Sequence, residues 1–162
     1  MALGLGSNQG SREDALVLAA RLLARHLDAP RLSSPYSTAA LCGAEQPRFL
    51  NAVLIGTTAS DPEHLLALAK GLEWLAGRRL GPRNDPRPLD VDLLVYGDRI
   101  ICHPELQVPH PRLRQRRFVL APLAEIAPEL PLPPDGAHPV ALLAALADDQ
   151  DVEQSVWSLA VL

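Results

Sequence analysis

Two stretches of the sequence place apolar residues at helical spacing. Residues 12–27 carry alanine and leucine at intervals of three and four, directly after a glycine-rich turn. Residues 62–76 repeat this pattern between an Asp61–Pro62 start and Gly77, a residue that commonly ends helices. The spacing therefore predicts an amphipathic helix over each range.

Shorter stretches alternate apolar and polar residues or are rich in β-branched residues, and we interpret them as strands. Four such stretches are present: an opening strand at 1–5, a proline-containing edge strand at 31–38, a strand at 48–58 and a central strand at 87–96. The order is strand, helix, strand, strand, helix, strand. It predicts an α+β, ferredoxin-like βαββαβ fold, an antiparallel sheet with helices packed on it. A C-terminal extension follows, with a hairpin near 100–102 and helices over 118–127 and 139–147.

Length and charge narrow the classes of partner. A chain of 162 residues is expected to form a single domain, residues 1–162. A net charge of −4 argues against nucleic acid or an anionic membrane as a partner. No apolar run reaches transmembrane length and the first residues lack a signal pattern, so a cytoplasmic location is expected. Cys42 and Cys102 are expected to be reduced thiols.

Arginines concentrate in one segment of this acidic chain. Nine of them lie between positions 78 and 117, whereas Lys70 is the sole lysine. A local basic region suits a small polyanion, such as a nucleoside triphosphate, better than a long one. The stretch 78–88 is also rich in proline and carries no pattern that orders it locally. We expect it to move in the free protein and to fold over an anion.

The predicted central strand carries two carboxylates on one face. Side chains alternate along a strand, so Asp90 and Asp92 point the same way, about 6–7 Å apart. Mg²⁺ takes carboxylate oxygens together with water and phosphate oxygens, and Arg87 adds an anion binder nearby. The pattern indicates either a metal–phosphate site or a solvated strand face with an ordinary Asp–Arg pair.

Two further positions combine unusual residues with restricted surroundings. Asn51 lies inside a predicted strand, with Phe49 on the same face. The pair either packs and bonds within the protein or stacks on a ligand and reads its polar edge. His110 lies between two prolines, which restrict its backbone and suit a fixed donor to phosphate.

Taken together, several motifs resemble those of the 6-hydroxymethyl-7,8-dihydropterin pyrophosphokinases. They cover most of residues 3–130 in order and are LGLGSNQG near the start, AEQPRFLNAV at 44–53, GR at 77–78, DPRPLDVDLLVYG at 85–97, VPHP at 108–111 and RRFVLAPLAEIAP at 116–128. The resemblance implies a folate-pathway enzyme in which ATP donates its β,γ-pyrophosphoryl group to the hydroxymethyl oxygen of the pterin and leaves as AMP.

The resemblance also implies roles for eleven residues. They divide among metal, ATP and pterin: Asp90 and Asp92 for two Mg²⁺ ions; Arg78 and Arg87 for catalysis and ATP; His110 and Arg116 for ATP; Thr38, Leu41, Phe49, Asn51 and Phe118 for the pterin. We expect a monomer. Two rival hypotheses stay open, a non-catalytic ferredoxin-like module that regulates a partner and a different Mg-ATP transferase on the same scaffold.

Overall fold

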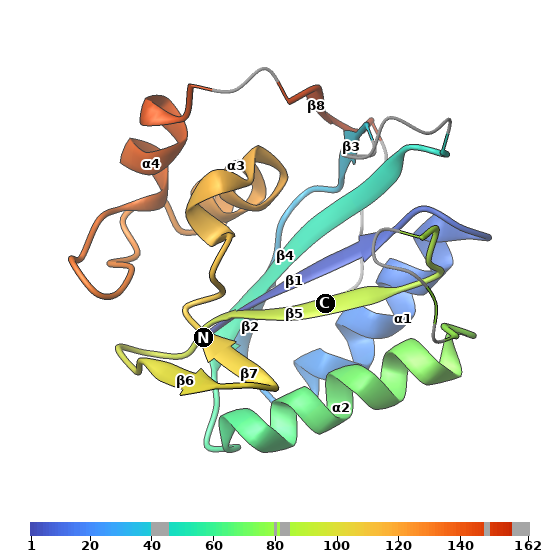
Figure 1. The fold of residues 1–162 in the computed structure, drawn as a ribbon, viewed down its shortest axis with the longest axis horizontal. Helices are drawn as coiled ribbons and strands as arrows, with labels where there is room; N and C mark the ends of the chain where they lie inside the picture. Colours follow the sequence, from blue (N-terminus) through green and yellow to red (C-terminus); the bar gives the residue numbers. More distant parts are fainter. Residues whose placement is uncertain (40–45, 80, 82–84, 148–149, 157–162) are drawn as a thin grey trace.

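The structure is a computed structural model that describes residues 1–39, 46–79, 81, 85–147 and 150–156. In these ranges, six strands pair antiparallel in one sheet, in the order β5, β1, β4, β3, β8, with β2 also paired to β4 (Figure 1). The strands are β1 (Ala2–Ser7), β2 (Asp28–Leu32), β3 (Tyr36–Thr38), β4 (Phe49–Thr57), β5 (Asp90–Val95) and β8 (Val152–Gln154).

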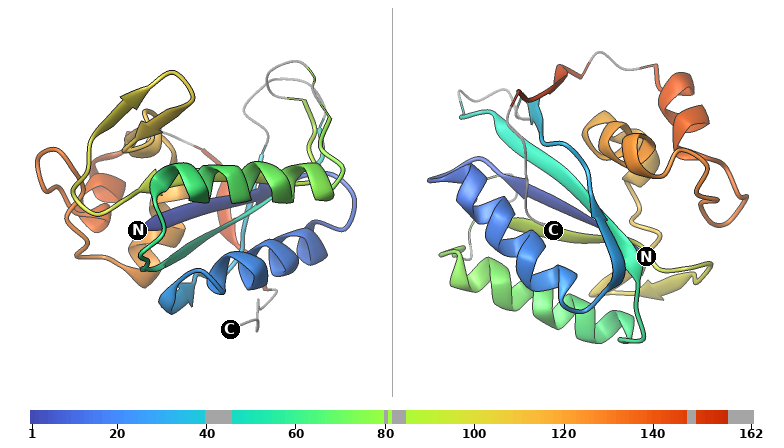
Figure 2. Two further views of the ribbon diagram at one scale, coloured as in Figure 1. Left: turned by 90° about the horizontal axis from the view of Figure 1, so that it is seen from below. Right: turned by 180° about the vertical axis from the view of Figure 1, so that it is seen from behind.

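Helices cover both faces of this sheet. They are α1 (Arg12–Ala24), α2 (Pro62–Leu75), α3 (Arg117–Ile126) and α4 (Pro139–Ala145), with a short 3-10 helix, η1 (Leu113–Gln115), before α3. Figure 2 shows α1 and α2 side by side against one face, while α3 and α4 lie on the opposite side of the sheet. A separate hairpin joins β6 (Ile101–His103) to β7 (Leu106–Val108).

Alternation along the strands divides the core into two layers. Leu5, Leu54 and Leu93 are buried in the layer that includes α1 and α2. Val53 and Leu94, their neighbours in sequence, are buried in the layer that includes α3. The second layer stops where glycine and polar residues replace the apolar ones on β1, β4 and β5. The open part of that face is where the candidate site lies.

The predicted α+β, ferredoxin-like fold is confirmed, and both helices of the βαββαβ unit are present. The strand predicted at 87–96 differs in place and length. In the described sheet β5 is an edge strand rather than the central one, because it pairs with β1 alone. It begins at Asp90, because the Arg87 backbone instead bonds Asn8: the Arg87 N–H donates to Asn8 Oδ1 at 2.8 Å, and the Arg87 carbonyl accepts the Asn8 N–H at 3.1 Å.

In place of the single edge strand predicted at 31–38, the structure has two strands, β2 and β3, which both pair with β4. Between them, Ser33 keeps contact with β4: its N–H donates to the Val53 carbonyl and its Oγ accepts the Val53 N–H, each at 2.9 Å. β2 starts as early as Asp28, so α1 ends three residues before its predicted end at residue 27. A positive φ of 47° at Ala29 accompanies the shift in strand register there.

The C-terminal extension contains both predicted helices, as α3 and α4, and adds an element. The hairpin prediction is wrong in its partner: residues 100–102 were expected to return after the turn at 98–99, but β6 pairs with the later strand β7 in a separate sheet. The added element is β8, which pairs with β3 and widens the sheet. The sequence did not predict it, because its three residues are too few to show a strand periodicity. Within the described residues, no helix is both long and apolar enough to cross a membrane.

Candidate active site

A row of directly opposed residues crosses the sheet on its open face. Gly6 of β1 pairs with Asp90 of β5 on one side and with Asn51 of β4 on the other. Opposed residues in a sheet present the same face, so a carboxylate and an amide flank a residue without a side chain. A Cβ at Gly6 would lie 3.0 Å from Asn51 Oδ1, so the glycine is required for this close approach. Gly4 separates Asp92 from Val53 in the same way.

A cavity of about 240 Å³ lies over these rows, between the sheet and α3. Ten of the eleven residues with predicted roles line it: Thr38, Phe49, Asn51, Arg78, Arg87, Asp90, Asp92, His110, Arg116 and Phe118. The eleventh, Leu41, lies outside the described residues, as do parts of the stretch 78–88 whose motion was expected. The fold thus brings together residues that are up to 80 positions apart in sequence.

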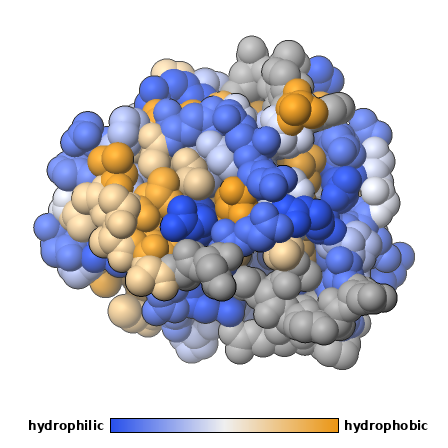
Figure 3. Space-filling model, turned by 90° about the horizontal axis from the view of Figure 1, so that it is seen from above, coloured by the Kyte–Doolittle hydropathy of each residue, from blue (hydrophilic) through white to orange (hydrophobic). Residues whose placement is uncertain are grey.

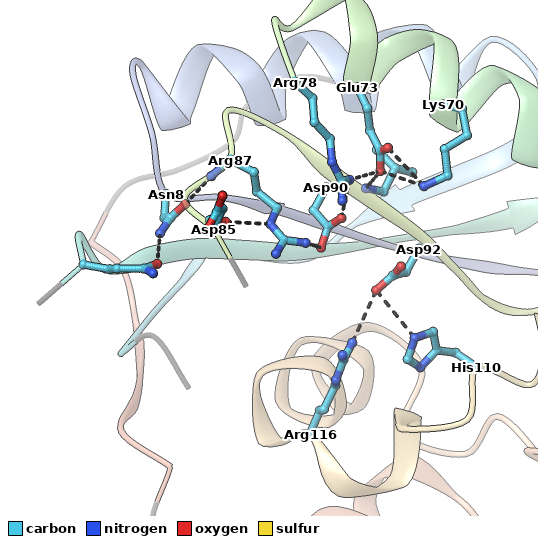
Figure 4. Close-up of polar contacts among 12 residues, drawn as sticks. Asn8, Lys70, Glu73, Arg78, Asp85, Arg87, Asp90, Asp92, His110 and Arg116 are labelled. Atoms are coloured by element: carbon cyan, nitrogen blue, oxygen red, sulfur yellow. Dashed lines mark hydrogen bonds and ion pairs between the residues drawn. The ribbon is translucent and has the colours of Figure 1, made fainter. Parts of the chain in front are cut away.

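Asp90 is held between two arginines of the segment that precedes it. Arg78 Nη1 lies 2.6 Å from Asp90 Oδ1, and Arg87 Nη1 lies 3.2 Å from Asp90 Oδ2 (Figure 4). Both carboxylate oxygens therefore have a cationic partner, and all three side chains are partly exposed to the cavity. The Asp–Arg pairing considered from the sequence is present, but it lies in a cavity rather than on an open strand face.

Asp92 points to the other wall, toward α3 (Figure 4). Arg116 Nη1 lies 3.3 Å from Asp92 Oδ2, and His110 Nε2 lies 3.8 Å from the same oxygen, beyond hydrogen-bond distance. The Arg116 side chain is 13% exposed, and burial is the main cause that lowers its pKa, although arginine keeps its charge. Its Nε is buried without a hydrogen-bond partner in the described structure. A phosphate oxygen is a suitable partner for such a donor.

The backbone fixes which nitrogen of His110 faces the cavity. His110 Nδ1 accepts the Arg112 N–H at 3.1 Å, and the His110 N–H donates to the Leu94 carbonyl at 2.9 Å. Burial, opposed by the charge of Asp92, lowers the pKa of His110. The neutral ring with Nδ1 as acceptor carries its proton on Nε2. His110 therefore presents a fixed N–H to the cavity.

The residues predicted to bind a flat ring lie at the far end of the cavity from α2. Asn51 Nδ2 donates to Thr38 Oγ1 at 2.9 Å, so one of its donors is used within the protein, as one sequence alternative proposed. Phe118, at the start of α3, has the Arg116 guanidinium carbon 5.3 Å from its ring centre. This contact links the part of the cavity lined by the residues predicted to bind the ring to the part lined by those predicted to bind ATP.

Two residues without a predicted role support the site. Glu73, 3% exposed on α2, accepts the Val91 N–H at 2.9 Å and pairs with Arg78 Nη1 at 2.6 Å. Asn8, 1% exposed in the glycine-rich turn, bonds both backbone groups of Arg87. Helical spacing gives a signal for Glu73, because it lies four and eight residues after the buried Ala69 and Leu65.

The donor set fits Mg²⁺. Asp90 and Asp92 are hard carboxylate ligands on one face, and phosphate oxygens and water complete such a shell. No cluster of three or more histidine, cysteine, aspartate or glutamate side chains with metal-binding geometry occurs in the described part of the chain. The protein would therefore supply these two carboxylates and leave the other ligand positions to substrate and water.

The surface above the cavity is strongly polar. Figure 3 shows hydrophilic residues in a band across this face, with apolar surface to the side where α4 lies. Two carboxylates, several arginines and a fixed histidine N–H under such a band are typical of a site for a polyphosphate and its metal ions. The fold and this cavity define a class: a ferredoxin-like domain whose cavity on one sheet face is lined by the residue types that suit a polyphosphate and its metal ions.

Comparisons with known proteins give the family within this class. Residues 2–128 match the family model of the 7,8-dihydro-6-hydroxymethylpterin-pyrophosphokinases. The chain is 40% identical over 146 residues to the Pseudomonas aeruginosa 2-amino-4-hydroxy-6-hydroxymethyldihydropteridine pyrophosphokinase, covering 88% of this chain and 89% of that protein. This chain belongs to the pyrophosphokinase family.

Larger proteins also contain this domain. The chain is 44% identical over 125 residues to the mitochondrial folate synthesis bifunctional protein of Arabidopsis thaliana. The matched region covers 76% of this chain but only 23% of that protein. A crystal structure of the Plasmodium falciparum HPPK-DHPS triple mutant superposes with a TM-score of 0.67 at 15% identity, over 89% of this chain and 42% of that chain. The structural likeness supports the fold, and the chain spans under half of these two fused relatives.

Proposed function

We propose that this chain transfers the β,γ-pyrophosphoryl group of ATP to the hydroxymethyl oxygen of 6-hydroxymethyl-7,8-dihydropterin, in the folate pathway. The hydroxymethyl oxygen bonds to the β-phosphorus while the bond between the β-phosphorus and the α,β-bridging oxygen breaks. AMP leaves with the bridging oxygen, and the hydroxyl proton passes to solvent. The observation that supports this reaction is the row Asp90–Gly6–Asn51. It places a proposed metal-binding carboxylate beside a proposed polar reader of a ring, with only a glycine, which has no side chain, between them.

The anion-binding half of the cavity would hold ATP. Arg116 and the His110 Nε2–H donate to its phosphates from the α3 side, while Arg78 and Arg87 approach from the α2 side. Mg²⁺ on Asp90 and Asp92 would neutralise the polyphosphate and orient it. Phosphoryl-type transfer needs mainly positioning and charge stabilisation from the protein. Arginines on two sides of the transferred group can supply both.

The other half of the cavity would hold the pterin. Phe49 and Phe118 offer aromatic faces for the ring, and Asn51 and Thr38 bind its polar edge. Leu41 keeps its predicted pterin role as a proposal. With the ring at this end, its hydroxymethyl group extends over Gly6 toward Asp90. We assign no general base, because each carboxylate on this face also has a proposed metal role.

The number of metal ions, the domain organisation, the oligomeric state and the compartment are also proposed. We propose two Mg²⁺ ions per active site, one domain over residues 1–162, and a monomer. The exposed, free thiol of Cys102 suits a reducing compartment such as the cytoplasm.

The nucleotide product tests the proposed function. With ATP, Mg²⁺ and the hydroxymethyl-dihydropterin, we expect AMP in a 1:1 ratio to the pterin diphosphate, measured by chromatography. Formation of ADP would show transfer of a single phosphoryl group and contradict the proposal. Absence of turnover, with the pterin still bound, would favour the non-catalytic module.

A further inference from the structure

Lys70 contacts the buried carboxylate that holds one of the active-site arginines. It lies on α2, one helical turn before Glu73, with Nζ 3.0 and 3.2 Å from the two Glu73 oxygens. Its side chain is 56% exposed, against 4% for Glu73, and it borders the active-site cavity. The sole lysine of the chain is thus in contact with the site, and the family resemblance gives it no role.

Glu73 has two cationic partners, and one of them is shared. Arg78 Nη1 lies 2.6 Å from Glu73 Oε1 and 2.6 Å from Asp90 Oδ1 (Figure 4). The same guanidinium nitrogen therefore bridges a buried glutamate and a proposed metal ligand. Lys70 contacts Glu73 from the other side (Figure 4), and among the described residues its amine forms no hydrogen bond or ion pair with Asp90.

Binding of the proposed substrate would change this arrangement. A metal ion at Asp90 repels a guanidinium that occupies the same carboxylate oxygen, so Arg78 must leave that position. If Arg78 also leaves Glu73, this nearly fully buried carboxylate loses one of its two cationic partners and keeps the Val91 N–H as its backbone hydrogen-bond donor. An unpaired buried charge is strongly unfavourable. Departure of Arg78 toward the polyphosphate therefore requires a second counter-ion at Glu73.

We propose that Lys70 is that counter-ion: a positioning residue that keeps Glu73 neutralised while Arg78 transfers from Glu73 and Asp90 to the bound polyphosphate. This inference rests on the proposed function, because it takes a metal-bound polyphosphate as the ligand. Lys70 itself does not contact the substrate. It lowers the free-energy cost of moving Arg78 and so strengthens nucleotide binding indirectly.

A double-mutant cycle between Lys70 and Glu73 tests this role. The readout is calorimetric affinity for a non-hydrolysable ATP analogue with Mg²⁺, and kcat where turnover is measured. We expect Lys70→Met to weaken analogue binding about ten-fold, within the range for coupled contacting charges. Lys70→Arg keeps the charge and should restore near wild-type affinity. Thermal unfolding of each variant shows whether it is folded.

The Glu73→Gln background separates the proposed role from a direct phosphate contact. Without a charge on Glu73, no counter-ion is needed, so Lys70→Met should change affinity less than two-fold there. An equal ten-fold loss in both backgrounds would show a direct contact and overturn the inference. So would wild-type affinity in Lys70→Met alone. Whether the wild type forms AMP tests the proposed function separately, and the binding cycle can be measured either way.

Discussion

The two faces of β1, β4 and β5 differ although the same strands form both. On the face toward α1 and α2, leucine and valine side chains make a continuous apolar layer. On the other face, the strands carry apolar residues at one end and glycine, aspartate and asparagine at the other. Alternation places the two kinds of residue one position apart, as with Asp92 and Leu93.

The comparison shows how one strand separates stability from chemistry. An apolar side chain on the face toward α1 and α2, here called the closed face, stabilises the fold by burial, at about 25 cal/mol per Å² of apolar surface. A carboxylate on the open face contributes little burial and is balanced by arginines from other elements. Substitutions on the first face should therefore change the free energy of unfolding, and those on the second should change turnover.

The largest expected effect is that of Asp92→Ala on turnover. It removes a proposed metal ligand and the partner of Arg116, and we expect kcat to fall by at least about 10²–10³-fold. The melting temperature should change little, because Asp92 is partly exposed. Asp98→Ala, in an exposed turn of the same region, is the control for loss of a carboxylate. Near-normal turnover of Asp92→Ala would remove its metal role.

Leu93→Ala should produce the opposite result. Leu93 is 6% exposed in the closed-face layer, and its truncation should lower the free energy of unfolding by about 2–5 kcal/mol. Denaturant unfolding measures this loss, and kcat is measured well below the melting temperature. We expect kcat to stay within a few-fold of wild type. A loss of turnover as large as that of Asp92→Ala in a folded Leu93→Ala would break the comparison of the faces.

Gly6→Ala tests the space between the two halves of the cavity. The added Cβ would lie 3.0 Å from Asn51 Oδ1 and displace the amide. We expect the KM for the pterin to rise about ten-fold, the value of one lost hydrogen bond, with a smaller change in the KM for ATP. Gly4→Ala is the matched variant, since its Cβ meets Leu94 methyl carbons at an ordinary 3.4 Å. Equal effects of the two substitutions would contradict a role for Asn51.

The smallest effect concerns a contact between the open face and α3. Tyr36 Oη donates to Glu125 Oε2 at 3.1 Å, and burial, then the Glu125 charge, raises the pKa of Tyr36 to about 12. Its protonated state therefore contributes stability that is full below about pH 10 and is lost as pH rises toward 12. Tyr36→Phe should weaken this alkaline loss in thermal unfolding. Identical slopes for wild type and Tyr36→Phe would refute it.

The sequence predicted the fold well where periodicity is long. Each of the two helices of the βαββαβ unit spans more than ten residues, and the structure contains both. Short elements depend on pairing partners distant in sequence, and there the predictions failed. β8 forms by pairing with the free edge of β3. β5 lies at the sheet edge because β1 pairs with β5 on one side and with β4 on the other, and β5 has no second neighbour in the described sheet. No local pattern contains this information.

The motifs selected the site residues but not the contacts among them. Ten positions predicted to share a site line one cavity. The pattern of Asp90 and Asp92 did not show that the two carboxylates face different walls, because Arg78 and Arg116 come from separate elements. Helical spacing put Glu73 on the buried face of α2, but the sequence did not show that Arg78 and the Val91 N–H are its partners there.

The central claim is that the open face binds metal ions through Asp90 and Asp92 together with a polyphosphate. Counting bound Mn²⁺ by electron paramagnetic resonance, with the non-hydrolysable ATP analogue present, tests it most directly. We predict two ions per wild-type chain, and fewer than two, bound more weakly, in Asp92→Ala. Two ions bound with unchanged affinity in Asp92→Ala would contradict the account, because the metals would then be held by the nucleotide alone.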